Sequence, residues 1–549
     1  MIQQKFCNKI VLIFTFISLF SFKSISQSNG FELIKNMEIT DLIYEHLEKY
    51  YVDEAKVGQL SKVAIDAMLK ELDPYTVYYH ESNMEDYRMM MTGEYGGIGS
   101  LIRKIGDYTY IAEPYEGNPA EKSGLKAGDK IISIDGKTMV GKLTDEVSSA
   151  LKGPKGTTIK VEVDREGEGI KFISVMRDEI KLPDVPYSGM LNETVGYVKL
   201  NSFTQTASSD VKKAMEELKS KGMTEMVLDL RGNGGGLLIE AVKIVNFFVK
   251  KGQTVVTTKG RVEEENRVYT TLEDPFDTTI PLTILIDEGS ASASEIVSGS
   301  LQDLDRAVII GSTSYGKGLV QRTYDLKYGS KMKLTIAKYY TPSGRCVQRL
   351  EYYDNADGEK PKEISDSLLK KFKTTTGRDV IDGRGIEPDV KITEREMSRL
   401  SATIYANNLI FNYATKFHVE NKNIEIAGKF KLSDAQYEAF KKYVLAETFT
   451  YSTASEEVLK KMKKTAEEEG YYEDSKAEYD ALLAKVVPSK ERDLEKFKDE
   501  IKIILENEII SRYYYQKGRA EDSFRNDLTI AESLKILKNI KEYNTILGK

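Results

Sequence analysis

The pattern of apolar and polar positions divides the chain into four parts that follow an apolar leader. Across residues 31–95 the apolar positions recur at three- and four-residue spacing, as in Leu42, Ile43 and Leu47, which predicts helices. Residues 27–93 are therefore expected to form an N-terminal helical region.

The next part, residues 94–180, changes to glycine clusters and short apolar alternations. These alternations predict strands at residues 108–112, 130–134, 158–164 and 171–177, with a helix at about 145–151. We expect a small β-rich domain.

Apolar runs then alternate with helical stretches over residues 181–392. The predicted strands are residues 196–200, 226–230, 281–287 and 306–311, and an amphipathic helix is expected at 237–249. Such alternation is typical of an α/β core with a buried sheet. Residues 393–549 are rich in Lys, Glu and Tyr with long helical periodicity, which predicts a C-terminal helical domain with a solvated charged face.

The leader indicates export. Lys5 and Lys9 precede an apolar run at residues 10–22, and small residues follow at the spacing that a signal peptidase reads. We predict a signal peptide over residues 1–26, cleaved near Ser26, and an exported, periplasmic location. An uncleaved anchor, with membrane association, is the alternative.

Composition limits the chemistry. Of 549 residues 30% are charged and the formal net charge is −7, so no general nucleic-acid surface is expected. Cys7 falls in the leader, which leaves Cys346 without a partner for an internal disulfide or a Cys-rich metal site. The sequence predicts no metal, nucleotide or redox cofactor.

A candidate nucleophile follows the predicted strand 281–287. Ser292 comes at the first turn of a helix expected to begin near Ala293, where unpaired backbone N–H groups carry positive partial charge. A serine there can attack a carbonyl while neighbouring N–H groups stabilise the oxyanion. The alternative is that Ser290, Ser292 or Ser294 only caps the helix.

A nucleophilic serine also needs a base. His46, His80 and His418 all lie outside the α/β core, so a Ser–His–Asp triad would require one of them to fold inward. Lysine can substitute where burial leaves it neutral. Lys317, flanked by glycines after the strand 306–311, is the candidate.

Two glycine-rich segments imitate nucleotide loops. Gly311 to Lys317 has the phosphate-loop spacing, but Gly318 stands where that motif needs Ser or Thr. The segment L-D-L-R-G-N-G-G-G from Leu228 resembles a dinucleotide loop, yet its spacing fails at Leu237. A glycine loop before a helix can instead donate N–H groups to an oxyanion.

Taken in order, the motifs of residues 40–392 resemble the C-terminal processing, or tail-specific, serine proteases. The segments that carry this resemblance are Y-V-D from Tyr51, L-D-P-Y-T from Leu72, G-G-I-G from Gly96, N-P-A-E-K-S-G-L-K-A-G-D-K-I-I-S-I-D-G-K from Asn118, L-D-L-R-G-N-G-G-G from Leu228, G-S-A-S-A-S-E from Gly289 and Y-G-K-G-L-V-Q from Tyr315.

The resemblance implies a multidomain chain of α+β and α/β parts. Its expected order is the N-terminal helical region, a PDZ domain over residues 94–180, a protease core with the tail-specific (crotonase/ClpP-like) fold over 181–392, and the C-terminal helical domain over 393–549.

The resemblance also implies roles for single residues. Ser292 would be the nucleophile, Lys317 the general base, and Gln321 the residue that orients the lysine, on the same face if this segment is helical. The N–H groups of Ala293 and Gly235 would form the oxyanion hole, with Gly234 as the other choice for the glycine loop.

Three further assignments come from the same resemblance. Asp303 is read as structural support. A carboxylate-binding loop of the PDZ domain is expected at Gly96, Gly97, Ile98 and Gly99. Lys152 stands where the family commonly has arginine, so its coupling of the PDZ domain to the active site is in question.

The implied function is a serine endopeptidase that processes or degrades exported proteins through their C-terminal tails. Two other functions stay open: a non-catalytic PDZ scaffold on an inactive protease core, and a Ser–Lys amidase acting on small molecules. Oligomerisation or adaptor binding through the C-terminal helices is also open.

Overall fold

The computed structural model describes residues 28–352, 361–393 and 396–549. The chain forms two compact units, one comprising the described residues up to His80 with Tyr324–Lys333, the other comprising Glu81–Thr323 with Leu334–Lys549. The predicted signal peptide lies outside the described residues. Within the described ranges, no helix combines the length and apolar character needed to cross a bilayer.

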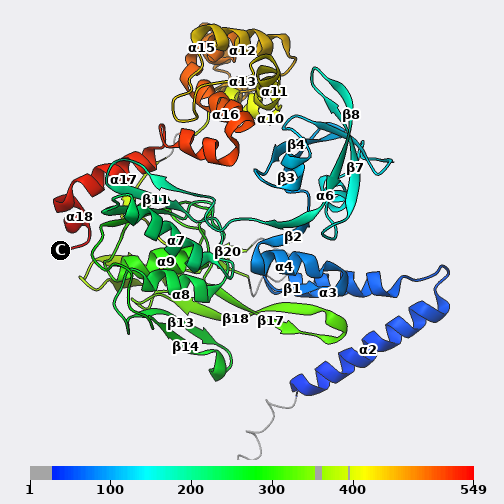
Figure 1. Cartoon of the computed structure of the whole chain (residues 1–549), viewed down its shortest axis with the longest axis vertical. Coiled ribbons are helices and arrows are strands. Elements are labelled where there is room, and N and C mark those ends of the chain that lie inside the picture. The colour runs from blue at the N-terminus through cyan, green and yellow to red at the C-terminus, as the bar shows by residue number, and fades with distance from the viewer. Residues whose placement is uncertain (1–27, 353–360, 394–395) are drawn as a thin grey trace, which may run out of the picture. The chain divides into compact units, whose positions relative to one another are not determined.

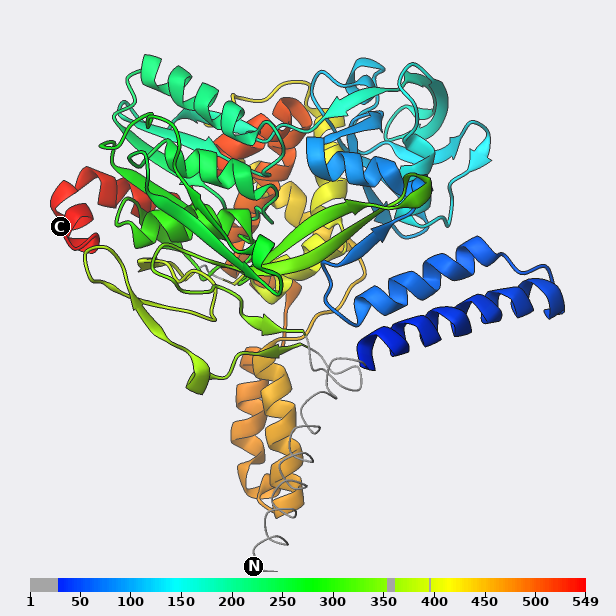
Figure 2. The ribbon, with the colours of Figure 1, turned by 90° about the horizontal axis from the view of Figure 1, so that it is seen from below.

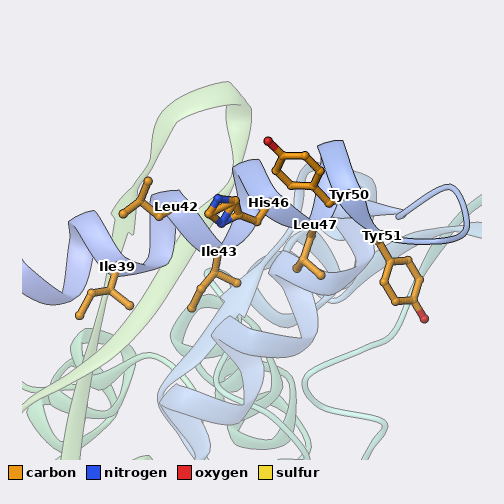
Figure 3. A pocket seen from close by; sticks show the side chains of 7 residues that line it. All are labelled: Ile39, Leu42, Ile43, His46, Leu47, Tyr50 and Tyr51. Atoms are coloured by element: carbon orange, nitrogen blue, oxygen red, sulfur yellow. The ribbon is translucent and has the colours of Figure 1, made fainter.

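The first unit contains two helices and a short strand. They are α2 (Ser28–Tyr50), α3 (Val57–Lys70) and β1 (Val77–Tyr79). Strand β1 pairs antiparallel with Lys331–Lys333, so the helical prediction for residues 31–95 is wrong at β1. Apolar side chains of α2 line an open pocket that also contains His46 (Figure 3).

The predicted PDZ domain has a sheet with strand order β3-β4-β5-β7-β8 and β6 beside β5. Its elements are β3 (Ser100–Ile105), β4 (Tyr108–Pro114), α5 (Pro119–Lys122), β5 (Lys130–Ile134), β6 (Lys137–Thr138), α6 (Thr144–Leu151), β7 (Thr158–Arg165) and β8 (Gly169–Met176). The four predicted strands and the helix of this part are confirmed. A separate ribbon of β2 (Glu94–Gly97) and β9 (Asp178–Lys181) joins its two ends, and α4 (Met84–Thr92) precedes it.

The α/β core is built on a six-stranded sheet, here called the core sheet, of order β10-β11-β12-β15-β16-β23. These strands are β10 (Tyr187–Met190), β11 (Val195–Lys199), β12 (Glu225–Asp229), β15 (Leu282–Ile286), β16 (Val308–Gly311) and β23 (Val390–Lys391). Only β10 is antiparallel to its neighbour; the pairs from β11 onward are parallel. This is the buried α/β sheet that the sequence predicted.

Helices cover both faces of this sheet. Because side chains alternate along a strand, Leu228 and Ile284 pack with α7 (Ala207–Ser220), α8 (Leu238–Asn246) and α9 (Ala293–Asp303), which lie together in Figure 1. Their neighbours Val227 and Leu285 face the other way, into a cluster with Ile530, Leu537 and Tyr543. The near-continuous apolar strands reflect burial on both sides.

Further strands accompany the core. Strand β13 (Thr254–Gly260) pairs antiparallel with β14 (Arg267–Thr270) and with Ala337–Tyr340 of β18 (Lys331–Tyr340). Strand β17 (Leu319–Asp325) pairs with β18. Two short ribbons are β19 (Leu350–Glu351) with β20 (Lys362–Glu363), and β21 (Lys371–Lys373) with β22 (Asp379–Ile381).

The C-terminal region is helical, as predicted, but its helices pack in two different places. A bundle with its own core contains α10 (Arg399–Ala406), α11 (Leu409–Glu420), α12 (Asp434–Ala446), α15 (Lys490–Lys496) and α16 (Lys498–Ser523). Figure 2 shows α13 (Ala454–Glu469) and α14 (Tyr472–Val486) as an antiparallel hairpin, in orange. The last two helices, α17 (Leu528–Lys538) and α18 (Ile540–Ile546), instead cover the core sheet. The C-terminal region predicted from residue 393 onward thus contains a bundle with its own core and, in α17 and α18, helices that pack on the core sheet.

The bundle also contacts the predicted PDZ domain. Arg519 of α16 pairs with the buried Glu113 of β4 at 3.1 Å, and the Arg103 guanidinium lies over the ring of Phe411. These contacts attach this β-rich domain to the helical bundle.

Truncation tests the assignment of α17 and α18. A chain ending at Asn526 lacks both helices and exposes the apolar face of β12, β15 and β16, so we expect loss of a cooperative thermal transition. As the control, a short Gly-Ser linker replaces residues 454–486, whose buried Leu459 and Tyr479 lie outside the core of the bundle. Its melting temperature, followed by circular dichroism, should stay within a few degrees. A truncated chain that unfolds like the full chain would contradict the assignment.

Candidate active site

Three loops meet at the carboxyl edge of the core sheet. They follow the adjacent parallel strands β12, β15 and β16, and comprise residues 230–237, 287–292 and 312–318. The carboxyl ends of parallel strands are the usual place for a site in an open α/β sheet. Ser292 and Lys317 come from two of these loops, and Gly235 from the third.

Ser292 has a strained backbone. Its φ of 55° and ψ of −110° lie outside the regions that L-residues normally adopt. The residue stands between β15 and the first residue of α9, Ala293. A serine held in this way at a sharp strand-to-helix turn is the arrangement of a nucleophile elbow.

The neighbouring serines serve the backbone instead. The fully buried Ser290 hydroxyl donates to the Leu230 carbonyl at 2.9 Å, and that of Ser294 donates to the Asn233 carbonyl at 2.9 Å. Ser292 is the one of the three that is only half-buried. Although Ser292 occupies the N-cap position of α9, the three serines thus differ in their exposure and partners.

The carboxylate of Glu295 joins two of the loops. Its Oε2 accepts the backbone N–H groups of Ser292 and Lys317, each at 2.8 Å. Its Oε1 accepts the Ser314 hydroxyl at 2.6 Å and the Gly316 N–H at 2.8 Å. Burial raises the pKa of Glu295, and these hydrogen bonds offset that rise only in part.

The loop that carries Lys317 is not a phosphate loop. A phosphate loop opens a helix and leaves its N–H groups for the phosphate, but here strand β17 follows. The N–H groups of Gly316 and Lys317 are donated to Glu295. The structure thus excludes the nucleotide interpretation on two grounds.

Gln321 lies in β17, so the helical condition for its predicted role is not met. Its side-chain amide donates to the Thr335 hydroxyl of β18 at 3.2 Å. Lys317 comes just before the strand, in an irregular segment. The orienting role of Gln321 stays a prediction.

The two predicted oxyanion donors lie next to each other. A Cβ on Gly235 would come within 2.9 Å of the Ala293 nitrogen, so no side chain fits there. Among the described residues the Ala293 N–H has no hydrogen-bond acceptor. The Gly235 N–H, in contrast, is donated to Asn233 Oδ1 at 2.8 Å.

A buried cluster of charged side chains supports the glycine loop, residues 230–237. Burial alone would raise the pKa of Asp229, but Arg231 and Lys199 beside it hold the value at about 2. Arg231 also pairs with Asp527, at the start of α17, at 2.8 Å. Asp287 then ties this loop to the nucleophile turn, since its Oδ1 accepts the N–H groups of Gly232 and Gly289.

The histidines lie elsewhere in the chain. His46 is on α2, His80 follows β1, and His418 is on α11 with its ring 4.7 Å from that of Tyr513. None belongs to the three loops.

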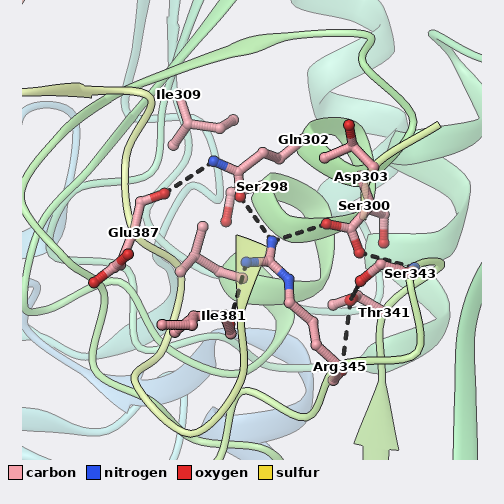
Figure 4. Close-up of polar contacts among 12 residues, drawn as sticks. Ser298, Ser300, Gln302, Asp303, Ile309, Thr341, Ser343, Arg345, Ile381 and Glu387 are labelled. Carbon is pink, nitrogen blue, oxygen red and sulfur yellow. Dashed lines mark hydrogen bonds and ion pairs between the residues drawn. The ribbon is translucent and has the colours of Figure 1, made fainter. Parts of the chain in front are cut away.

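Asp303, at the other end of α9, belongs to a buried ion pair. Its Oδ1 lies 2.9 Å from the Arg345 guanidinium, and its Oδ2 accepts the Ser343 N–H at 3.0 Å. Figure 4 shows Arg345 reaching Gln302 as well. Both partners are about 1% exposed, in keeping with structural support.

The predicted PDZ loop has two open donors. Within the described residues no hydrogen bond engages the N–H groups of Ile98 and Gly99, while the Gly96 N–H is donated to Glu85 Oε1 at 2.9 Å. The loop leads into β3, an edge strand of its sheet. Lys152 lies near it, with its amine 5.5 Å from the Tyr95 ring centroid.

Comparison with known proteins identifies the family to which the chain belongs. Family models match over residues 194–352 (Peptidase family S41), 110–165 (PDZ domain) and 400–537 (Probable PDZ-protease, C-terminal helical domain). A probable CtpA-like serine protease of Staphylococcus aureus (strain bovine RF122 / ET3-1) is 32% identical over 403 residues, covering 72% of this chain and 79% of the relative. The chain belongs to peptidase family S41.

The chain is also similar to a second staphylococcal protein and to a solved structure. The probable CtpA-like serine protease of Staphylococcus haemolyticus (strain JCSC1435) is 33% identical over 359 residues, or 65% of each chain. A solved structure, the photosystem II D1 C-terminal processing protease, is 27% identical and covers 64% of this chain and 86% of that chain, with a TM-score of 0.36. The family models and the CtpA-like relatives together show that this chain is an S41 serine protease with a PDZ domain.

Glu295 was not among the predicted site residues, although its spacing from Ser292 is a signal in the sequence. Ser292 and Glu295 have the S-x-x-E spacing of a capping box, in which the acid accepts the N–H of the capping residue. The bond from Lys317 could not be read from the sequence, because it joins residues 22 positions apart.

Replacing Glu295 tests its part in the S41 peptidase. In Glu295→Gln one oxygen becomes an NH₂ group that faces N–H or O–H donors, so we expect the Lys317 loop to shift and kcat/KM to fall roughly 100-fold. The matched control is Glu240→Gln, a buried acid on α8 that accepts the Ser208 N–H. Peptidase activity and melting temperature would be measured for both. Near-normal activity in Glu295→Gln would contradict the assignment.

Proposed function

We propose that this S41 peptidase is an endopeptidase with a Ser292–Lys317 catalytic dyad. The observation that carries the proposal is the shared Glu295 Oε2, which accepts the backbone N–H groups of both residues. A base drawn from a loop 25 positions away in the sequence must be held beside its nucleophile, and one buried carboxylate oxygen serves that purpose. The strained backbone of Ser292 supports its part as the nucleophile.

In the proposed reaction the neutral amine of Lys317 takes the proton of the Ser292 hydroxyl. The Ser292 oxygen attacks the peptide carbonyl, and the tetrahedral oxyanion is stabilised by backbone N–H groups. The protonated amine then gives its proton to the leaving amine, and water hydrolyses the acyl-enzyme with Lys317 again as the base. Gln321 is proposed to orient the amine.

The oxyanion hole would use the N–H of Ala293 first, since no acceptor occupies it among the described residues. A second donor from the glycine loop requires the Gly235 N–H to leave Asn233 Oδ1, or the exposed Gly234 to supply its own. The resting geometry thus provides one donor, and substrate binding would complete the pair.

We infer that the PDZ domain captures the C-terminal tail of protein substrates. The N–H groups of Ile98 and Gly99 would receive the terminal carboxylate, and the tail would extend the sheet along β3. Gly96 and Gly97 complete the loop. Exported proteins are the proposed substrates, with the enzyme itself exported to the periplasm behind a cleaved signal peptide.

A non-catalytic PDZ scaffold is the second candidate. It would need the PDZ loop but not the strained Ser292 or the buried Glu295, both of which the chain retains. The geometry of the core therefore favours the peptidase.

The dyad is tested with Ser292→Ala and Lys317→Arg. Removal of the hydroxyl, or retention of a permanent positive charge at residue 317, should lower kcat/KM by at least about 1,000-fold. In the wild type kcat/KM should rise with pH as Lys317 loses its proton, since the base acts only when neutral. Hydrolysis of a tail-bearing protein substrate would be followed across the pH range.

Labelling of the serine by a fluorophosphonate gives a second measurement. Ser300→Ala is the matched control, because Ser300 is a buried hydroxyl farther along α9 that donates to the Val255 carbonyl. It should keep its labelling. Equal hydrolysis by wild type and Ser292→Ala would remove Ser292 as the nucleophile.

Tail capture is tested with peptides that differ only at the C-terminus. A free carboxylate should bind about tenfold more tightly than an amide, because only the carboxylate is matched to the N–H groups of the loop. Gly99→Ala should abolish this difference, since φ is +70° and a Cβ would come 2.6 Å from that of Asn118. Gly106→Ala, also at positive φ but with open space around it, is the control. Fluorescence anisotropy measures binding, and equal affinities for the two peptides in the wild type would contradict the proposal.

A further inference from the structure

We propose that Gln348 is a positioning residue for the base, acting on the peptide group that follows Lys317. This inference rests on the proposed dyad. Gln348 belongs to the segment Thr341–Leu350, here called the strap, which follows β18 and crosses the loop that carries Lys317.

The first step is that the peptide groups on both sides of Lys317 are held by side chains. The Lys317 N–H is donated to Glu295. The next N–H, that of Gly318, is donated to Gln348 Oε1 at 2.8 Å. The Cα of Lys317 is therefore fixed from two directions, by one acceptor on the nucleophile helix and one on the strap.

The second step is that the strap touches the loop too closely for any other residue than glycine. A Cβ on Gly318 would come within 2.8 Å of the Gln348 nitrogen, and a Cβ on Gly316 within 2.5 Å of the Arg349 Cβ. The Arg349 N–H is also donated to the Gly316 carbonyl at 3.0 Å. The two glycines that flank Lys317 therefore allow the strap to pack directly against the backbone of this loop.

The third step is that Gln348 has a fixed orientation. Its side chain is 3% exposed, and its Nε2 donates to the Leu350 carbonyl at 2.6 Å. Because one end of the amide faces an N–H and the other a carbonyl, only one of its two orientations satisfies both. The acceptor is thus aimed at Gly318.

The fourth step is that the strap is itself anchored to the nucleophile helix. Arg345 of the strap pairs with Asp303 and donates to Gln302, both at the end of α9 (Figure 4). The carbonyls of Cys346 and Val347 accept the N–H groups of Gly383 and Gly385. Helix α9 therefore sets the place of Lys317 twice, through Glu295 near its start and through the strap at its end.

Loss of the Gln348 acceptor should therefore affect the chemical step. The Gly318 N–H would be left without its partner, and a shift of about 1 Å in a reacting group can cost roughly 100-fold in rate. Substrate affinity should change little, because the side chain is buried. A displaced amine would meet more water, which favours its protonated form and weakens it as a base at neutral pH.

The experiment compares Gln348→Met, which has similar length but no acceptor, with Gln348→Asn, which keeps the amide but is one methylene too short. Both should lower kcat roughly 10- to 100-fold with KM within about twofold. Both should move the rising limb of the pH–rate profile to higher pH by at least about half a unit. Gln348→Glu retains an acceptor oxygen and should recover part of the lost kcat.

A purely structural role gives a different pattern. The control Asn246→Leu removes another buried amide, one that holds the backbone of Leu272 and Glu273; it should lower the melting temperature without moving the pH–rate profile. If Gln348→Met fails to fold, Gln348→Asn decides. Folded Gln348 variants with the wild-type kcat and profile, or with an unmoved profile and no recovery by Gln348→Glu, overturn the inference.

The failure of the dyad would be seen separately. If Ser292→Ala hydrolyses substrate as well as the wild type, the proposed function falls and this inference with it. If Ser292→Ala is inactive while Gln348→Met matches the wild type in kcat and pH profile, the dyad stands and only the inference is overturned.

Discussion

The candidate active site depends on the fully buried carboxylate of Glu295, which faces four hydrogen-bond donors. Glu295 accepts two N–H groups on one oxygen, and an N–H and a hydroxyl on the other. An acceptor-only group of this shape is available only from an ionised acid. An amide cannot replace it, because half of its hydrogen-bonding surface has the wrong polarity. Taking such a charge out of water is costly, so its retention in the core is explained by what it holds together.

The same logic extends along helix α9. The candidate nucleophile Ser292 lies at the start of the helix. Glu295, one turn later, binds the loop that carries Lys317, and Asp303 at the end of the helix pairs with Arg345. The parts of the site come from distant segments of the sequence, yet each of them is held by contacts to the same helix, α9. Sites built on regular elements are held more closely than sites built on loops alone.

The sequence predicted the elements well and the contacts poorly. Strands with one clear period, such as β5 and β15, were found because burial dictates their pattern. Ser292 and Lys317 could be named from their motifs. The bonds from Glu295 to Lys317 and from Gln348 to Gly318 could not, since each joins residues more than 20 positions apart. Strand β1 was missed for a related reason: its partner is the segment Lys331–Lys333, far along the chain.

The placement of α17 and α18 has a consequence for how the enzyme comes into being. These helices cover one face of the core sheet, and the candidate active site lies at the carboxyl ends of its strands. Asp527, at the start of α17, pairs with Arg231 of the glycine loop. During synthesis the chain emerges from its N-terminus, so this face stays bare until α17 and α18 have been made. A nascent or clipped chain would lack both the cover and the ionic support of that loop. The core sheet and its glycine loop are therefore complete only after residues 527–546 have joined them.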